Sequence, residues 1–425
     1  MAAFSFQIKH QDRLTQARLG RIVTPHGSID TPAFVPVGTQ ATVKSLTPDE
    51  LNTLGIQLFF VNTYHIYLRP GVNTIKAAGG LHGFMGWDKP LITDSGGFQI
   101  FSLGAKKYIN IAISESAVLD RQRFTRKQSK KEGIADDVFP DDYRPVGTLV
   151  TVDEDGVTFT SHWDGTKHRF TPEISTQLQY DLKADLTIAF DECAPFPTTY
   201  DYAQKAMDRT HRWADRCLRT SHKLKSKYRS KYQQALYGVV QGSVYRDLRI
   251  KSAETIGNMD FDGIAIGGVA VGESKTDVKN VLEWTIPHLP AQLPRHLLGV
   301  GKIDDIFTLV AAGIDTFDCV QPTRLARMGH LLVTPVAGEP VKYVLDITKG
   351  IYARDMRPIS DSCSCYTCGT FSRSYIHHLF RVRELLAYRL ATIHNLHFMQ
   401  SLMDEIRGAI RNQSFSRLLS KWIPD

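Results

Sequence analysis

The segment TDSGGFQ at 93–99 carries the residue types of an acid–base site that a flat ligand can approach closely. It follows an apolar run directly, and its chemistry-bearing residues are Asp94, Ser95, Gly96, Gly97 and Phe98. The glycines let backbone amides come near a ligand, Asp94 has the chemistry of a general acid or base, and Phe98 has a ring that can stack on a nucleobase. The alternative interpretation is a turn in which Asp94 caps the next helix.

A second carboxylate stands in DTFDCVQPTRLARMGH at 315–330, where Asp318 is followed by Arg324 and Arg327 near a proline turn. An aspartate can act as a nucleophile at an anomeric carbon, and arginines hold nucleic acid through base or phosphate contacts. This combination suits attack on the sugar of a nucleic acid. A structural ion pair between Asp318 and one of the arginines is the alternative.

Three further segments offer groups that match the polar edge of guanine. FDECAPFP at 190–197 contributes Asp191, VVQGS at 239–243 contributes Gln241, and IGGVAVGE at 266–273 contributes the bare backbone of Gly267 and Gly268. A carboxylate accepts from the N1–H and 2-amino pair of guanine, while an amide or a glycine N–H donates to its carbonyl oxygen. Glu273 is a further carboxylate candidate for this pocket. Each residue alone is more typical of a turn or a helix cap, but all of them follow apolar runs.

Cys363, Cys365 and Cys368 form a C-x-C-x₂-C turn that can present three thiolates to a metal ion. Zinc needs a fourth ligand to complete a tetrahedron. A histidine is the natural candidate, and spacing leaves four possibilities open: His377, His378, His394 and His397. Three thiolates and an imidazole leave no open coordination position, so this pattern predicts a structural zinc site. The alternative is a chance cluster of reduced cysteines.

The elements that must position these groups are short apolar runs, each ending in a polar or glycine-bearing segment. Eight such runs, with helix-like stretches between most of them, lie at 33–38, 58–65, 91–97, 186–192, 235–243, 263–273, 295–301 and 313–319. Alternating strands and helices imply a parallel sheet, and eight units are the count for an α/β protein built as a (β/α)₈ TIM barrel. A doubly wound open sheet is the competitor, but no GxGxxG motif follows an early strand.

Two segments interrupt this rhythm. At about 104–148 a charged segment with the basic core RQRFTRKQSKK is predicted to be an exposed insertion, either a solvated loop or a nucleic-acid contact. Beyond Cys368 the apolar spacing of three and four residues predicts helices. We therefore predict a catalytic barrel over 1–345 and a C-terminal zinc-binding helical subdomain over 346–425.

The composition is that of an ordinary globular protein. The chain has 425 residues, of which 42% are hydrophobic and 22% charged, and this excludes disorder as its main state. No apolar run approaches the roughly 20 residues of a membrane-spanning helix, and the first thirty residues lack a signal-peptide core, so we expect no membrane partner and a cytoplasmic location. The net charge of +7 is compatible with a polyanionic partner.

The motifs together resemble one family, the bacterial type of tRNA-guanine transglycosylase (queuine tRNA-ribosyltransferase). TDSGGFQ, FDEC, VVQGS, GGVAVGE, GVG, FDCVQPTR and the cysteine turn with a later HNL occur in that family's order. The resemblance runs from about Phe4 to the helical C-terminus and fails across roughly 104–148.

The resemblance implies base exchange: guanine at the wobble position of tRNAs with a GUN anticodon, those for aspartate, asparagine, histidine and tyrosine, is replaced by a 7-deazaguanine. Asp318 matches the nucleophile that forms a covalent enzyme–tRNA intermediate, and Asp94 matches the general acid/base. Ser95, Gly96, Gly97, Phe98, Asp191, Gln241, Gly268 and Val269 match the base-binding segments. The expected tRNA contacts are Gly299, Val300, Gly301, Lys302, Ile303, Asp304, Asp305, Thr323, Arg324, Leu325, Ala326 and Arg327.

The same comparison implies His394, the histidine of HNL, as the fourth ligand of one structural Zn²⁺ per subunit, and a homodimer formed with the help of the zinc subdomain. Cys193 and Val271 resemble the pocket that takes prequeuosine-1 base, and queuine is the alternative substrate. Three positions depart from the family: Leu325 and Met328 stand where small or polar residues are usual, and Val269 stands where leucine is common.

Two other functions share parts of this pattern. A non-catalytic tRNA-binding subunit of the same fold is disfavoured because both Asp94 and Asp318 are retained. A barrel hydrolase with catalytic zinc is disfavoured by the three thiolates and by the absence of an HxH motif after an early strand.

Overall fold

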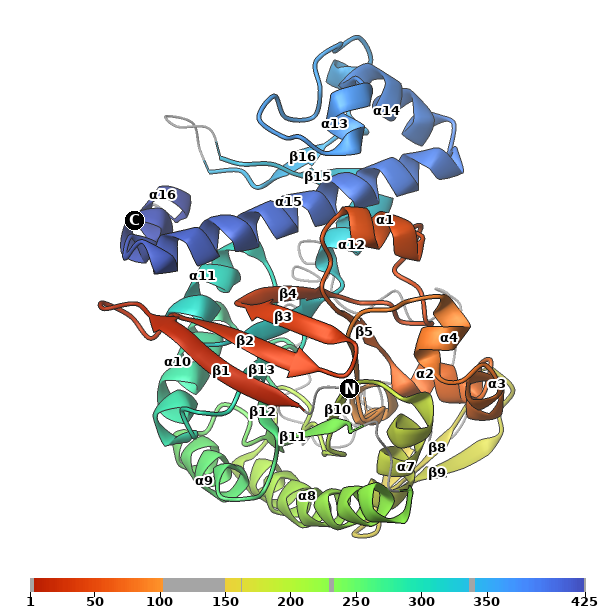
Figure 1. Ribbon diagram of the computed structural model, residues 1–425, viewed down its shortest axis with the longest axis vertical. Coiled ribbons are helices and arrows are strands. Elements are labelled where there is room, and N and C mark those ends of the chain that lie inside the picture. Colours follow the sequence, from red (N-terminus) through yellow and green to blue (C-terminus); the bar gives the residue numbers. More distant parts are fainter. Residues whose placement is uncertain (1–3, 102–149, 162, 229–232, 336–340, 424–425) are drawn as a thin grey trace, which may run out of the picture.

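The computed structural model describes residues 4–101, 150–161, 163–228, 233–335 and 341–423 (Figure 1). The predicted charged insertion at 104–148 lies outside the described residues. None of the helices in the described ranges is long and apolar enough to cross a membrane.

Eight parallel strands form the central barrel, and they correspond one to one to the eight predicted apolar runs. The sheet order is β4-β14-β13-β12-β11-β10-β6-β5, and a parallel bridge between Val37 and Phe60 joins its two ends. The (β/α)₈ prediction is therefore confirmed. The strands are β4 (Ala33–Pro36), β5 (Phe59–Val61), β6 (Leu91–Thr93), β10 (Leu186–Ile188), β11 (Ala235–Val240), β12 (Gly263–Ile266), β13 (Arg295–Leu297) and β14 (Thr316–Cys319).

Helices surround this sheet and connect its strands (Figure 1). α1 begins with a capping box in which Thr47 and Glu50 satisfy each other's backbone N–H groups. The helical elements between β4 and the end of the barrel are α1 (Pro48–Thr53), α2 (Thr63–Leu68), α3 (Val72–Ala77), α4 (Leu81–Met85), α7 (Pro172–Leu182), α8 (Tyr200–Tyr228), α9 (Arg246–Gly257), α10 (Lys275–Thr285), η2 (Ile286–His288), α11 (Ile303–Ala311) and α12 (Gln321–Arg327).

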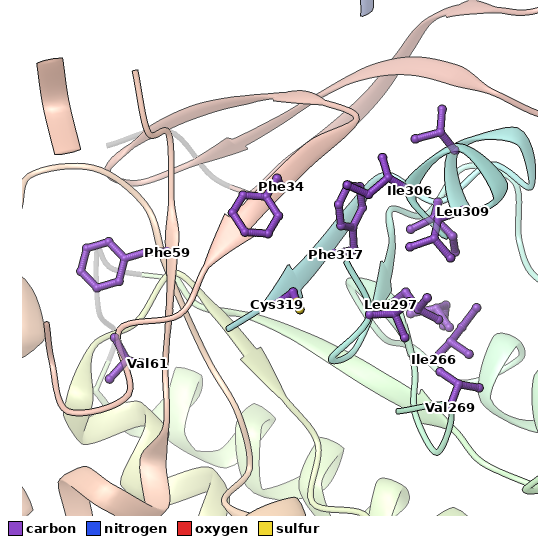
Figure 2. Packing of buried hydrophobic residues seen from close by; sticks show 14 of the residues in the cluster. Phe34, Phe59, Val61, Ile266, Val269, Leu297, Ile306, Leu309, Phe317 and Cys319 are labelled. Atoms are coloured by element: carbon purple, nitrogen blue, oxygen red, sulfur yellow. The ribbon is translucent and has the colours of Figure 1, made fainter. Parts of the chain in front are cut away.

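The core has an inner and an outer layer because neighbouring residues of a strand face opposite sides. In β4, Val35 belongs to a buried cluster with Ile92 and Tyr237, whereas Phe34 belongs to the larger cluster between strands and helices. Figure 2 shows this larger cluster, in which Phe34 and Phe317 from neighbouring strands pack near residues of α11 such as Ile306. The packed sheet gives the loops at its carboxyl edge a rigid base.

In the described part of the chain, two small three-stranded antiparallel sheets accompany the barrel. One consists of β1 (Ser5–Gln11), β2 (Arg18–Thr24) and β3 (Gly27–Thr31), and the other of β7 (Val150–Val152), β8 (Val157–Thr160) and β9 (Lys167–Phe170). Sequence analysis predicted neither of them.

The first small sheet contacts the barrel through two stacked histidines and a buried aspartate. His26 and His82 stack with ring centroids 3.6 Å apart. The buried Asp185 lies 2.8 Å from His26 Nδ1 through Oδ1 and accepts from the Leu91 N–H through Oδ2. His82 Nε2 lies 3.0 Å from the carbonyl oxygen of Lys89 and therefore donates to it. This cluster fastens the β2–β3 turn to the amino ends of β6 and β10.

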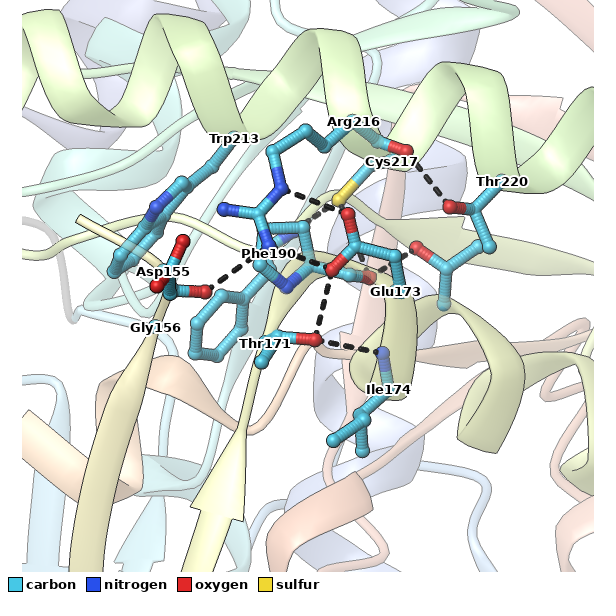
Figure 3. A network of polar contacts seen from close by, with 12 residues as sticks. Asp155, Gly156, Thr171, Glu173, Ile174, Phe190, Trp213, Arg216, Cys217 and Thr220 are labelled. Atoms are coloured by element: carbon cyan, nitrogen blue, oxygen red, sulfur yellow. Dashed lines mark hydrogen bonds and ion pairs between the residues drawn. The ribbon is translucent and has the colours of Figure 1, made fainter. Parts of the chain in front are cut away.

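The second small sheet is joined to the barrel helices α7 and α8 by Arg216, which forms an ion pair with Glu173 and also contacts the turn between β7 and β8 (Figure 3). Arg216 donates from Nε and Nη2 to the two oxygens of Glu173, each at 2.7 Å, and Nη2 also reaches the carbonyl of Asp155. Thr171 donates to the same carboxylate. Next to it, Cys217 Sγ accepts from the N–H of Phe190, so the network ends one residue before Asp191.

The C-terminal part consists of β15 (His330–Leu332), β16 (Val344–Asp346), η3 (Gly350–Tyr352), α13 (Tyr366–Thr370), α14 (Arg373–Arg381), α15 (Leu385–Arg411) and α16 (Phe415–Trp422). The long helix α15 contacts α12, β4, β1 and β2 on the barrel side, and α13, α14 and β15 on the other (Figure 1). The predicted helical character beyond Cys368 is confirmed. The division into two domains at 345/346 stays a prediction.

Candidate active site and metal centre

Asp94 follows β6 and is held by three donors from neighbouring loops. Its Oδ1 accepts from the Thr63 N–H at 2.7 Å, and its Oδ2 accepts from Asn62 Nδ2 at 2.6 Å and Gln99 Nε2 at 2.8 Å. Burial raises the pKa of Asp94 to about 6, these hydrogen bonds oppose the rise, and the charge of Asp318 adds to it. A carboxyl group with such a pKa can give and take a proton near neutrality.

Asp318 lies in β14 and is oriented from the adjacent strand β13. Its Oδ1 accepts from the Gly299 N–H at 3.0 Å and lies 3.1 Å from His296 Nε2. The other ring nitrogen of His296 lies 2.9 Å from Thr316 Oγ1. His296 Nε2 donates to this carboxylate, and the Thr316 hydroxyl contacts the other side of the ring.

The two carboxylates belong to one electrostatic environment. β6 and β14 are separated in the barrel by β5 and β4, and both aspartates stand at the carboxyl edge of the sheet. The charge of Asp318 contributes to the raised pKa of Asp94, and the charge of Asp94 in turn contributes to the raised pKa of Asp191. The three aspartates predicted from sequence are thus brought together at the barrel mouth.

Asp191 and Gln241 form the centre of the predicted base pocket. Gln241 Nε2 donates to Asp191 Oδ2 at 2.7 Å, and Ser95 Oγ lies 3.4 Å from Asp191 Oδ1. Burial raises the pKa of Asp191 to about 6. Gly97 packs so tightly that a Cβ there would lie 2.9 Å from the Asp191 carbonyl oxygen. The loop after β6 therefore needs glycine to bring Ser95 against Asp191.

Phe98 lies at the edge of this pocket with 44% of its surface exposed. Glu273 accepts from the Val271 N–H at 2.8 Å, and burial, aided by the negative charges of Asp191 and Glu273, raises the pKa of the Cys193 thiol. An exposed ring beside a buried polar pocket is suited to stacking on a planar ligand.

The predicted metal ligands converge. His394 Nδ1 lies 3.3 Å from Cys368 Sγ, 3.6 Å from Cys365 Sγ and 3.8 Å from Cys363 Sγ, so the four residues form a group that could hold a metal ion. His394 Nε2 donates to the Leu332 carbonyl at 2.8 Å, which leaves the Nδ1 lone pair facing the sulfurs.

Of the other three histidines, His377 is buried and binds the Ile347 carbonyl, and His378 is exposed. His397 Nδ1 lies 3.6 Å from Cys363 Sγ, at the edge of the cluster.

Comparison with known proteins decides the family. The profile of the family described as "Queuine tRNA-ribosyltransferase" matches residues 12–130 and 140–425 of this chain. The chain belongs to the queuine tRNA-ribosyltransferase family. The match extends further into the 104–148 segment than the sequence motifs suggested.

Curated relatives named queuine tRNA-ribosyltransferase cover nearly the whole chain. The protein from Halothermothrix orenii is 43% identical over 412 residues, covering 97% of this chain and 95% of the relative. Those from Thermoanaerobacter pseudethanolicus and Acetivibrio thermocellus are each 44% identical, over 411 and 410 residues, covering 97% and 96% of this chain and 94% of each relative.

The two segments that the sequence analysis predicts to contact tRNA lie next to Asp318 in this member of the queuine tRNA-ribosyltransferase family. Residues 299–305 comprise the loop after β13 and the start of α11, and α12 follows β14. Lys302 is exposed, Gly299 faces Asp318 with its N–H, and Asp304 pairs with Lys275. Arg324 and Arg327 are half-buried, as are Leu325 and Asp305, whereas Val300, Ile303, Thr323 and Ala326 have buried side chains. Any tRNA contact by this last group would have to use the backbone.

Sequence reasoning missed several residues of this family member's site. Asn62 and Thr63 follow β5 as polar residues after an apolar run, the signal used for other strands. His296 is paired in register with Thr316 across β13 and β14, and no single segment contains both residues. Lys44 was also missed; burial, aided by the positive charge of Arg327 on α12, lowers the pKa of its ammonium group.

Proposed function

We propose that this chain exchanges guanine at the wobble position of tRNA for a 7-deazaguanine through two displacements at one ribose carbon. In the first, an oxygen of Asp318 forms a bond to the anomeric carbon while the bond from that carbon to guanine breaks, and Asp94 protonates the leaving base. In the second, the incoming base attacks the same carbon, Asp94 takes its proton, and Asp318 leaves. Two inversions retain the configuration.

The observation that carries this proposal is the arrangement of Asp318 beside a second carboxyl group with a raised pKa. The hydrogen bonds from Gly299 and His296 both fall on Oδ1. Within the described ranges Oδ2 has no donor, which leaves it as the attacking oxygen. Asp94 supplies the proton transfer that expulsion of an anionic base requires.

Base recognition is assigned to Asp191, Gln241 and the backbone of Gly268 and Val269. The Asp191 carboxylate accepts from the N1–H and 2-amino group of the base, and the amide groups donate to its carbonyl oxygen. Ser95, Gly96 and Gly97 shape the wall, and Phe98 stacks on the ring. Cys193 and Val271 favour prequeuosine-1 base as substrate, and competition between both bases and labelled guanine distinguishes it from queuine.

The tRNA is expected to lie over α12 and the 299–305 loop, with Arg324, Arg327 and Lys302 as cationic contacts. Lys44, whose pKa is lowered beside Arg327, gains a counter-ion when a phosphate binds there. Recognition of GUN anticodons is proposed from the family membership.

The Cys363, Cys365, Cys368 and His394 group is proposed to hold one structural Zn²⁺. Sulfur and imidazole ligands are the set that zinc prefers, and four protein ligands leave no position for an activated water. The oriented His394 ring supports this assignment.

A homodimer through the zinc subdomain is supported by apolar side chains that the C-terminal part exposes. Ile351, Met356, Tyr366 and Leu385 are 75%, 76%, 61% and 81% exposed. Large exposed side chains of this kind mark protein–protein contact surfaces.

The function is tested by incubating the protein with an anticodon stem-loop bearing U-G-U and with radiolabelled guanine. Wild type should incorporate label and give an RNA-linked adduct on a denaturing gel. Asp318→Asn should lose both, and Asp94→Asn should lose incorporation. Incorporation by Asp318→Asn at the wild-type rate would overturn the assignment of the nucleophile.

A further inference from the structure

Arg249, on α9, is a fully buried cation between the two loops of the base pocket. Its relative exposure is 0%, and its donors reach four backbone carbonyls. Nε donates to Ser243 at 2.6 Å, Nη1 to Val240 at 3.2 Å and Gly267 at 2.8 Å, and Nη2 to Gly268 at 2.7 Å. These carbonyls belong to the ends of β11 and β12 and the loops that follow them, which carry Gln241 and Val269.

Carbonyl dipoles, and not a carboxylate, solvate this charge. Among the residues that the structure describes, no acid forms an ion pair with Arg249. Burial lowers the pKa of Arg249 to about 10, and the negative charge of Glu273 opposes this shift. The guanidinium is therefore charged at neutral pH. A fixed fork of donors holds several acceptors in one geometry, which a flexible ammonium cannot do.

The contacts of Arg249 fix the direction of two amide groups. In a trans peptide the C=O of one residue and the N–H of the next point in opposite directions. Because the carbonyls of Gly267 and Gly268 point at Arg249, the N–H groups of Gly268 and Val269 point away from it. Among the described residues, neither N–H donates a hydrogen bond to an acceptor. Val269 is 2% exposed, so this unpaired donor is buried, and a ligand oxygen would satisfy it.

Gln241 is packed against the same peptides. A Cβ on Gly267 would lie 2.7 Å from Gln241 Nε2, and one on Gly268 would lie 2.5 Å from Gln241 Oε1. Gly268 also has φ +63°, a conformation that favours glycine. A shift of the 267–269 backbone would therefore displace the side chain that donates to Asp191.

We propose that Arg249 is a positioning residue for base recognition: it holds the Gly268 and Val269 N–H groups and the Gln241 amide as one preformed set of donors for the carbonyl oxygen of the base. This inference rests on the proposed exchange reaction. Arg249 acts through these groups and does not itself touch the base. Its loss should weaken binding of the free base and leave tRNA docking unchanged.

The test uses Arg249→Met and Arg249→Lys, with Arg18→Met as the matched control. Arg18 is another buried arginine; it donates to the carbonyls of Ala291 and Leu293 and to Asp315, at the amino end of the strand that carries Asp318. The KM for radiolabelled guanine and the KM for the stem-loop are measured separately in the full-length protein, together with thermal unfolding.

The KM for guanine should rise at least about tenfold in Arg249→Met, with the KM for the stem-loop within about twofold of wild type. Arg249→Lys keeps the positive charge but lacks the planar set of guanidinium donors, and its KM for guanine should rise by an intermediate amount. Arg18→Met should lower Tm without changing either KM. A wild-type KM for guanine in Arg249→Lys, or equal rises of both KM values in Arg249→Met, would overturn the proposal.

Arg249→Lys decides the question if Arg249→Met does not fold. Absence of guanine incorporation by wild type would instead count against the proposed function itself, so the two failures are distinguishable.

Discussion

The imidazole of His296 is fixed against the carboxylate of Asp318, with Nε2 3.1 Å from Oδ1. Both residues are buried, and the ring is held from behind by Thr316. Together with the Gly299 N–H, this contact occupies Oδ1 of Asp318, and among the described residues no donor reaches Oδ2. His296 thus orients the proposed nucleophile.

His296→Phe should slow formation of the RNA-linked adduct by about 10- to 150-fold, because a hydrogen bond to a charged group contributes roughly 1.5–3 kcal/mol. The KM for guanine should not change, since His296 does not contact Asp191 or Gln241. The control is Thr316→Val, which removes the partner of Nδ1 but leaves Nε2 in place and should cost less. Rapid-quench measurement of adduct formation checks this, and an unaltered rate in His296→Phe would contradict it.

The pH dependence should differ between the two half-reactions, because Asp94 has a pKa of about 6 and must be protonated in one and ionised in the other. Adduct formation should fall as the pH rises above about 6, whereas discharge of a preformed adduct by guanine should not. Asp191, whose pKa is also about 6, must be ionised in both, so both rates should fall at lower pH.

Gln99→Leu provides the control for this assignment. Gln99 donates to the charged form of Asp94, so its loss should raise the pKa of Asp94 further and move the alkaline limb of adduct formation upward. An alkaline limb that is absent in wild type, or that Gln99→Leu leaves in place, would refute the role of Asp94 as the acid.

The barrel and the three aspartates could be predicted from sequence because each strand is one short apolar run and parallel strands place their carboxyl ends at one edge. Cys363 and Cys365 could be predicted as metal ligands for a different reason, because they belong to one short C-x-C-x₂-C motif. The contacts that orient the aspartates and the base pocket could not be predicted. His296 meets Asp318 across two strands, and a charged residue such as Arg249 on a helix is ordinarily read as solvent-exposed until its surroundings are known.

The ion pair between Glu173 and Arg216 should stabilise the fold by about 1 kcal/mol, since both side chains are partly exposed and solvent screens them. The Arg216 hydrogen bonds lower the pKa of Glu173 to about 2 from its ordinary 4.5. The contribution is therefore complete above about pH 4.5 and is lost as the pH falls toward 2.

A double-mutant cycle with Glu173→Gln and Arg216→Met, followed by urea unfolding at pH 7 and pH 3, measures this coupling. The exposed i, i+4 pair Asp215 and Arg219 on the same helix serves as the control and should show weaker coupling. Coupling that is as strong at pH 3 as at pH 7 would show that the carboxylate charge is not its source.

Removal of the proposed Zn²⁺ should unfold the C-terminal part without a direct effect on the chemistry. Cys365 is buried in a cluster with Ile376 and Ala391, so Cys365→Ser should lower the free energy of unfolding by at least about 2 kcal/mol. Zinc content, thermal unfolding and sedimentation are compared with adduct formation at a temperature where the variant is folded. Cys217→Ser, a buried cysteine outside the metal group, controls for loss of a thiol alone. A variant that stays folded and keeps its oligomeric state, yet loses adduct formation, would show that the metal takes part in catalysis.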